Sequence, residues 1–313
     1  RASTLAQLLS AEEKPKEFRV PQCLGYFDGR EYNQQHGQPI VPRKFGFVYA
    51  MPDTIPPGSR PRSLRQLLGD ATVSKPDIGD RVAMARALAT SLLYLHTVEW
   101  FGKSLRSDNV IFFTIDASHG EEIDYANPIH SGFDCVERME SIEEKYHTEA
   151  PCNDVHAQLY LHPETSKDSK EPYRKSFDIY SLGVVFVELA FWMPIEDVLA
   201  KYDKMHFKKA NPTWDETDPK QRPRPLTIFD VQYAVSRPSQ IKAIRSKLLH
   251  QDLVAGIGSE MGRMFKDLTW TCLKGGEELN LKPDDDEALP SVGAKVSGAY
   301  WEKVVRQLEE IRV

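Results

Sequence analysis

The sequence has few cysteines, and they are not paired in sequence. The four cysteines of the 313 residues lie far apart, at Cys23, Cys135, Cys152 and Cys272. Zinc sites of the common cysteine type need closely spaced ligands, and disulfide-rich secreted domains need many cysteines. We therefore expect neither a metal site nor a disulfide framework, and a reducing, cytoplasmic location.

The chain also lacks a long apolar run and an excess of positive charge. Its longest apolar stretch, residues 182–193, is interrupted by Glu188 and is shorter than the roughly 20 residues that span a bilayer. The formal net charge is −6, whereas binding to a nucleic-acid backbone requires a basic surface. These features argue against membrane insertion by this chain and against nucleic-acid partners.

Hydrophobic spacing predicts a mixed chain of α-helices and short β-strands. The first part is expected to hold a helix at 1–11 and strands at 18–27 and 45–51, followed by a Pro- and Gly-rich connector at 52–61. The second part is expected to be mainly helical, with Ser63 and Asp80 as N-caps of its first two helices. Its helices are predicted at 64–68, 80–96, 177–193, 238–250, 259–274 and 291–312, with a hairpin from 110 and loops or short helices at 201–240.

Short sequences in the second part resemble protein-kinase motifs, in the kinase order. Residues 102–111 (GKSLRSDNVI) resemble the catalytic-loop pattern H-R-D-L-x-x-x-N, with Leu105 and Asn109 at the family spacing. Gly132-Phe133-Asp134 stands in the place of the D-F-G sequence. Several motifs in series are more specific than any one of them alone.

Two further matches follow. His162-Pro163-Glu164 resembles the A-P-E sequence, and residues 176–183 (SFDIYSLG) look like the start of the kinase helix whose aspartate, here Asp178, ties down the catalytic loop. The resemblance implies structural roles for Pro163, Glu164 and Asp178. The variant loop at 103–109 and the segment 160–164 look like the kinase-like domains of filamentous fungi, which often follow a HeLo-type helical bundle.

The resemblance implies an α+β, protein kinase-like fold with a mainly helical C-terminal lobe and a truncated N-terminal lobe. Residues 1–52 would be the remnant of the N-terminal lobe, 53–62 the hinge and 63–313 the C-terminal lobe. The glycine-rich loop G-x-G-x-x-G of kinases is not found in the sequence.

The residues that would transfer a phosphoryl group depart from the family. Ser104 stands at the position of the catalytic aspartate, and Gly132 stands at the position of the aspartate that binds magnesium. Lys103 replaces an arginine that contacts an activation-loop phosphate, and it either keeps that role or is an ordinary exposed lysine. We therefore predict no catalytic residues, no cofactor and weak or absent ATP binding.

Three polar residues near these positions have two interpretations each. Asn109 is a second-metal ligand or, as we favour, a loop amide that bonds to nearby backbone. Asp134 replaces the missing carboxylate only if the backbone shifts, and otherwise is solvated. His96 is a general base or a packed histidine, and we favour the latter. Asp178 is expected to accept hydrogen bonds from the backbone of 102–105.

The leading hypothesis is a pseudokinase that acts in signalling by protein–protein contact and regulates an attached effector domain. The acidic segment 134–161 would be its docking or switch region, or else a disordered insertion. The alternative is an atypical active kinase that uses Asp108 or Asp134 in displaced roles, and a third hypothesis is an assembly scaffold. The acidic run 284–286 is interpreted as a solvated surface rather than a metal site.

Overall fold

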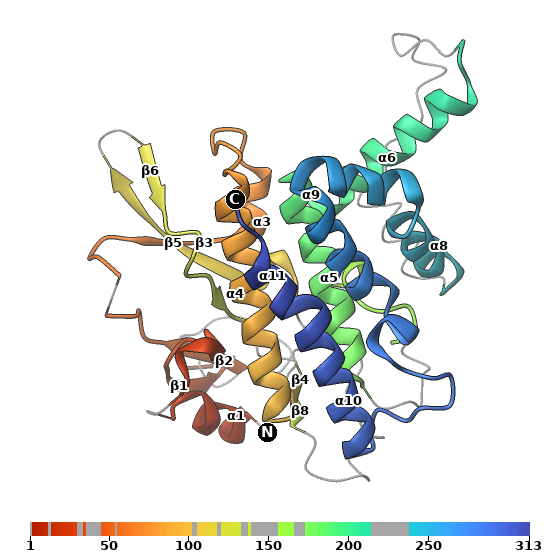
Figure 1. Cartoon of the computed structure of the whole chain (residues 1–313). Coiled ribbons are helices and arrows are strands. Elements are labelled where there is room, and N and C mark those ends of the chain that lie inside the picture. The colour runs from red at the N-terminus through yellow and green to blue at the C-terminus, as the bar shows by residue number, and fades with distance from the viewer. Residues whose placement is uncertain are drawn as a thin grey trace.

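The computed structural model describes residues 2–11, 14–29, 34–35, 45–53, 55–101, 105–117, 120–132, 137–138, 156–165, 173–213 and 238–313. Within these ranges the chain is mixed α and β, with helices in the majority and three small sheets (Figure 1). This agrees with the expected α+β class. None of the helices in these ranges combines the length and the apolar character that crossing a bilayer requires.

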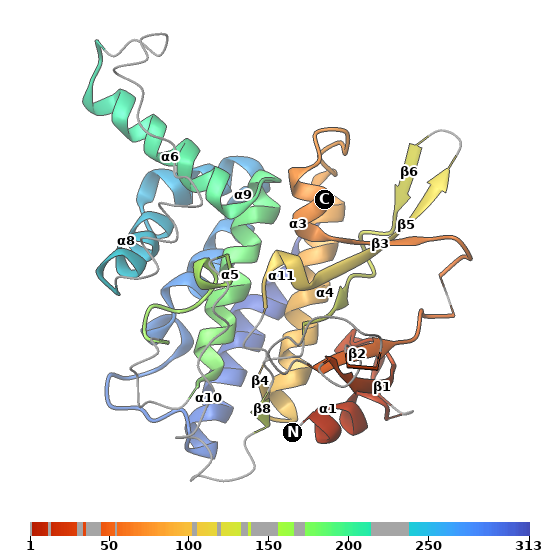
Figure 2. The same cartoon turned by 180° about the vertical axis from the view of Figure 1, so that it is seen from behind.

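The first part of the chain packs around a small core that it shares with Leu95 and Trp100 of the second part. Helix α1 (Ala2–Leu9) packs on strand β1 (Cys23–Asp28), which pairs antiparallel with β2 (Phe45–Tyr49). The first strand starts later than predicted, because Lys16–Phe18 form a turn of 3-10 helix and Arg19 has a left-handed φ of 51°. In both views these elements lie against one end of the long helix α4 (Ile78–Thr97) (Figures 1 and 2).

The helices that follow the connector begin at capped residues. Strand β3 (Arg60–Ser63) leads into α3 (Leu64–Gly69), where the Ser63 hydroxyl accepts from Gln66 N at 3.2 Å and Gln66 Oε1 accepts from Ser63 N at 2.8 Å. This capping box confirms the predicted start. The long helix α4 is present as predicted, but its predicted N-cap Asp80 is wrong, because Asp77 caps it: Asp77 Oδ1 accepts from Asp80 N at 2.8 Å.

A four-stranded sheet lies beside α3 and α4. Its strands β3, β5 (Val110–Ala117) and β6 (Gly120–Ile123) are neighbours in that order, and β7 (Ile129–His130) also pairs with β5. A separate pair joins β4 (Trp100–Phe101) to β8 (Glu137–Arg138). The predicted hairpin from residue 110 is confirmed, whereas the last residues of the predicted connector belong to β3.

The rest of the described chain is helical. Its α-helices are α5 (Lys175–Phe191), α6 (Ile195–Ala210), α8 (Pro238–Leu248), α9 (Gln251–Lys274), α10 (Pro290–Tyr300) and α11 (Arg306–Glu310). Short 3-10 turns occur at Ser107–Asn109, Ala157–Leu159 and Gly276–Leu279, and a π-helical turn at Trp301–Val305 joins α10 to α11.

Helix α6 corrects the sequence prediction for residues 201–210, which were expected to be loop or short helix. Its composition is polar, but four residues at helical spacing are buried: Ile195, Val198, Leu199 and Tyr202. That apolar face packs against α5, and burial of such a face supplies most of the stability of a helix in a folded protein. Helix α9 is also longer than predicted, with a break at Gly262, where φ is +83°.

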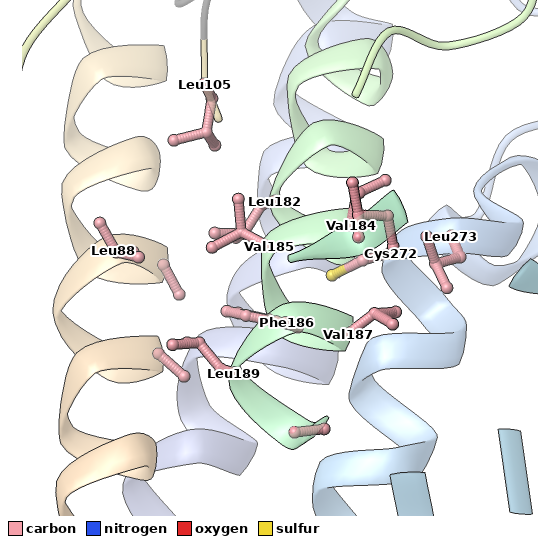
Figure 3. Close-up of a cluster of buried hydrophobic side chains, with 14 of the residues drawn as sticks. Leu88, Leu105, Leu182, Val184, Val185, Phe186, Val187, Leu189, Cys272 and Leu273 are labelled. Carbon is pink, nitrogen blue, oxygen red and sulfur yellow. The ribbon is translucent and has the colours of Figure 1, made fainter. Parts of the chain in front are cut away.

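Helix α5 lies at the centre of the main core. Its residues are apolar nearly all round and are almost all buried, as predicted, and Figure 3 shows them between α4 and α9. A glycine permits the close approach of α9, because a Cβ on Gly183 would lie 2.9 Å from Cys272 Cβ.

Candidate functional site

The sequence-predicted site residues divide into two groups. Lys103, Ser104, Phe133 and Asp134 lie outside the described residues. Asn109, Gly132, Pro163, Glu164 and Asp178 lie within them.

Asn109 and Gly132 are brought together by strand pairing. Asn109 ends a 3-10 turn that leads into β5, and the pairing of Val110 with His130 carries the chain back beside it. The Asn109 carbonyl accepts hydrogen bonds from Ser131 N at 2.8 Å and Ser131 Oγ at 3.1 Å. The next residue after Ser131 is Gly132, so its α-carbon is held against the Asn109 side chain.

The Asn109 amide group occupies the space that a side chain at 132 would need. A Cβ built on Gly132 would lie 2.1 Å from Asn109 Nδ2 and 2.3 Å from its Cγ, far inside van der Waals contact. The backbone of Gly132 also has a φ of +82°, which L-residues rarely adopt. A side chain at 132 would therefore require the Asn109 amide to move and the backbone to accept a left-handed φ.

Asp108 lies between two guanidinium groups. Its carboxylate oxygens are 3.8 Å from Arg65 Nε and 3.8 Å from Arg106 Nε. Arg65 also binds both oxygens of Glu196 at the start of α6, and that hydrogen bonding raises the pKa of the Arg65 guanidinium. The two arginines therefore place positive charge beside Asp108, at distances beyond a hydrogen bond.

A buried polar network joins the 3-10 turn at 107–109 to α5. Glu188 Oε1 accepts hydrogen bonds from Tyr160 Oη at 2.7 Å, Ser107 Oγ at 3.2 Å and Ile195 N at 3.0 Å. Glu188 Oε2 is buried, and no described residue gives it a hydrogen bond. Burial raises the pKa of Glu188 to about 8, although its hydrogen bonds oppose the shift.

This network was missed in the sequence, where Glu188 was noted only as an interruption of an apolar stretch. Its partners Ser107 and Tyr160 come from other segments, so spacing gives no sign of the contact. A glutamate inside a helix that is otherwise apolar all round is the one available signal, because a buried acid needs partners.

Asp178 is fully buried at the start of α5. Its Oδ1 accepts from Tyr173 Oη at 2.8 Å, and its Oδ2 lies 3.1 Å from His96 Nε2 at the end of α4. The expected partners at 102–104 lie outside the described residues. His96 is itself buried, which agrees with the packed interpretation of that histidine.

Pro163 and Glu164 lie nearer the surface. Glu164 is exposed, and one of its carboxylate oxygens is 4.0 Å from Arg174 Nη1, a pair that adds little to stability in water. The preceding His162 stacks on Phe177 with ring centroids 4.7 Å apart. Burial, with two nearby arginines, lowers the pKa of His162 to about 3, so the ring is neutral.

The sequence matches no family model and no curated protein in the comparisons made with it.

Proposed function

We propose that this chain is a kinase-shaped binding module that acts in signalling through a protein partner and transfers no phosphoryl group. The contact between Asn109 and Gly132 carries the proposal. At the position where the resemblance places the magnesium carboxylate, the chain has an α-carbon covered by an amide. Magnesium held on ATP needs that negative charge.

The order of elements supports the kinase-like part of the proposal. A helix, two paired strands, a Pro-rich connector, a long helix, a hairpin and a buried central helix follow one another as in a protein kinase from its C helix onward. Function does not follow from such a fold, so the site chemistry decides between catalysis and binding.

The surface of the first sheet supports a role in protein contact. Strands β1 and β2 expose apolar side chains that are usually buried, with Leu24 at 68%, Phe27 at 44% and Val48 at 45% exposure. Exposed apolar side chains on a paired strand are candidates for contact with a partner. By its resemblance to fungal HeLo-associated domains, the module would regulate an attached effector domain in the cytoplasm, without a nucleic-acid partner.

The position of Asp108 between two arginines weighs against the alternative of an atypical active kinase. Two arginines share its charge, and Arg65 is in turn held by Glu196. A displaced catalytic role for Asp108 would require this arrangement to open.

Thermal unfolding with Mg-ATP and a radiolabel assay test the proposal. Millimolar Mg-ATP should leave the melting temperature unchanged, because only a ligand that binds the native state stabilises it. Transfer of the γ-phosphoryl group from labelled ATP to protein should be absent. Transfer that is lost in Asp108→Ala or Asp134→Ala would overturn the proposal in favour of the kinase alternative, and oligomers in light scattering without any ligand would favour the scaffold.

A further inference from the structure

Two histidines and an aspartate meet at the end of the molecule where α6, α8 and α9 gather (Figures 1 and 2). His206 lies on α6, His250 follows α8 as the N-cap of α9, and Asp252 is in the first turn of α9. One potential ligand atom from each residue lies within 4.8 Å of the others. None of the three belongs to the candidate site around Asn109 and Gly132.

The geometry points to a site for a divalent transition-metal ion, with zinc as the best match. Asp252 Oδ2 lies 3.1 Å from His206 Nε2 and 4.0 Å from His250 Nδ1. Ligand atoms at about 2.0–2.1 Å from a tetrahedral zinc ion are separated by about 3.3 Å, so small side-chain movements close the site. Imidazole nitrogens with one carboxylate suit zinc better than calcium or magnesium, which prefer oxygen ligands.

The nitrogen of His206 that faces the cluster is available to a metal. His206 Nε2 is buried and makes no hydrogen bond of good geometry with any described residue, although it lies near the Asp252 carboxylate. The imidazole rings of His206 and His250 are 4.6 Å apart at 88°, with the ring of Tyr202 against both. Packing thus limits the rotation of both ligands.

Two features oppose metal binding and set its strength. His250 Nδ1 accepts a hydrogen bond from Asp252 N at 3.3 Å, and coordination replaces that bond. Lys209 Nζ lies 3.6 Å from Asp252 Oδ2 and competes with a cation for its charge. Lys209 is 71% exposed, so its side chain moves into water when a metal binds.

Three protein ligands leave one tetrahedral position for water, and the partial exposure of the cluster lets water reach it. The metal would cross-link α6 to the start of α9 beside the ion pair of Asp203 with Lys247, whose atoms are 2.6 Å apart. Its three protein ligands and open position differ from the closed four-ligand arrangement of structural zinc sites, and the site is independent of the proposed loss of phosphoryl transfer.

The inference is tested by titrating zinc into the chelator-stripped 313-residue chain, with binding measured by calorimetry. Wild-type protein should bind zinc and unfold at a higher temperature with it. His206→Ala and Asp252→Asn should each lower the affinity by at least about 10-fold, since loss of even an outer partner of a metal ligand has that effect. Asp252→Asn keeps the shape of the side chain and therefore serves if His206→Ala fails to fold.

Asp203→Asn is the matched control, because it removes a carboxylate from α6 outside the ligand set, and it should bind zinc as wild type does. Lys209→Met should bind zinc more tightly, since the competing charge is gone. Cobalt substitution should give visible bands of tetrahedral nitrogen and oxygen coordination. Equal zinc affinity in wild type and Asp252→Asn, or a thiolate charge-transfer band with cobalt, would overturn the inference.

Discussion

Replacement of Gly132 by alanine measures how tightly the Asn109 side chain covers residue 132. Alanine at φ +82° pays the left-handed backbone penalty of about 1–2 kcal/mol. Its Cβ would also meet Asn109 Nδ2 at 2.1 Å, and overpacking of this kind costs about 1–3 kcal/mol. The free energy of unfolding of Gly132→Ala should therefore fall by about 2–5 kcal/mol.

Gly58→Ala separates the two contributions. Gly58 has a similar φ of +89°, but no heavy atom lies within 4 Å of a Cβ built there. Its substitution should cost only the backbone penalty of about 1–2 kcal/mol. The difference between the free energies lost in the two variants measures the cost of crowding by Asn109.

Urea unfolding monitored by circular dichroism gives the free energies of unfolding of both variants. A double-mutant cycle with Asn109→Ala gives the coupling energy between residues 109 and 132. The amide is removed in the double variant, so the crowding part should be recovered as a coupling energy of about 1–3 kcal/mol. If Gly132→Ala costs no more than Gly58→Ala, the space over residue 132 is open, and the reasoning that excludes a carboxylate there is refuted.

Two buried carboxyl groups give the remaining predictions. Asp178→Ala should lower the free energy of unfolding by about 1–3 kcal/mol, because Tyr173 loses its acceptor and the buried His96 loses a partner. Asp267→Ala, at an exposed aspartate, is the control. A loss in Asp178→Ala no larger than in this control would contradict the prediction. Burial raises the pKa of Glu188 to about 8. Between about pH 5 and 8 the folded chain therefore keeps a proton that the unfolded chain releases. The free energy of unfolding should fall as the pH rises through this range and then level off. In the Glu188→Gln variant, the free energy of unfolding should no longer fall between about pH 5 and pH 8. If it falls equally in the variant and the wild type, other groups cause the pH dependence.

The parts of the fold that were predicted correctly depend on local chemistry. The Ser63 cap is visible because its partner Gln66 is three residues away, and α5 is visible because its apolar residues are continuous. The start of α4 was misplaced because Asp77 and Asp80 are both good caps, and the choice depends on which carboxylate reaches the free backbone N–H groups. Helix α6 was missed because residues 201–240 were assessed together as polar and Pro-rich, whereas the helix ends at Ala210, before the first proline of that segment, Pro212.

In the candidate site, too, the sequence indicates local features but not the contacts between distant segments. The kinase-like pattern indicates Asn109 and Gly132, but it does not predict that the Asn109 side chain covers the Gly132 α-carbon. The partners of Glu188 come from separate segments, and the pair His206 and His250 comes from different helices. Contacts between distant segments depend on the folded chain and leave no periodic signal in the sequence.

The close approach of α5 and α9 at Gly183 also makes Cys272 a natural reporter of the core. Its thiol is fully buried, and burial raises its pKa, so it exists as the unreactive protonated form. Alkylating reagents can reach it only when the two helices separate. The buried thiol of Cys23 belongs to the other, smaller core under β1, so the two labelling rates compare the opening of the two cores within one native molecule.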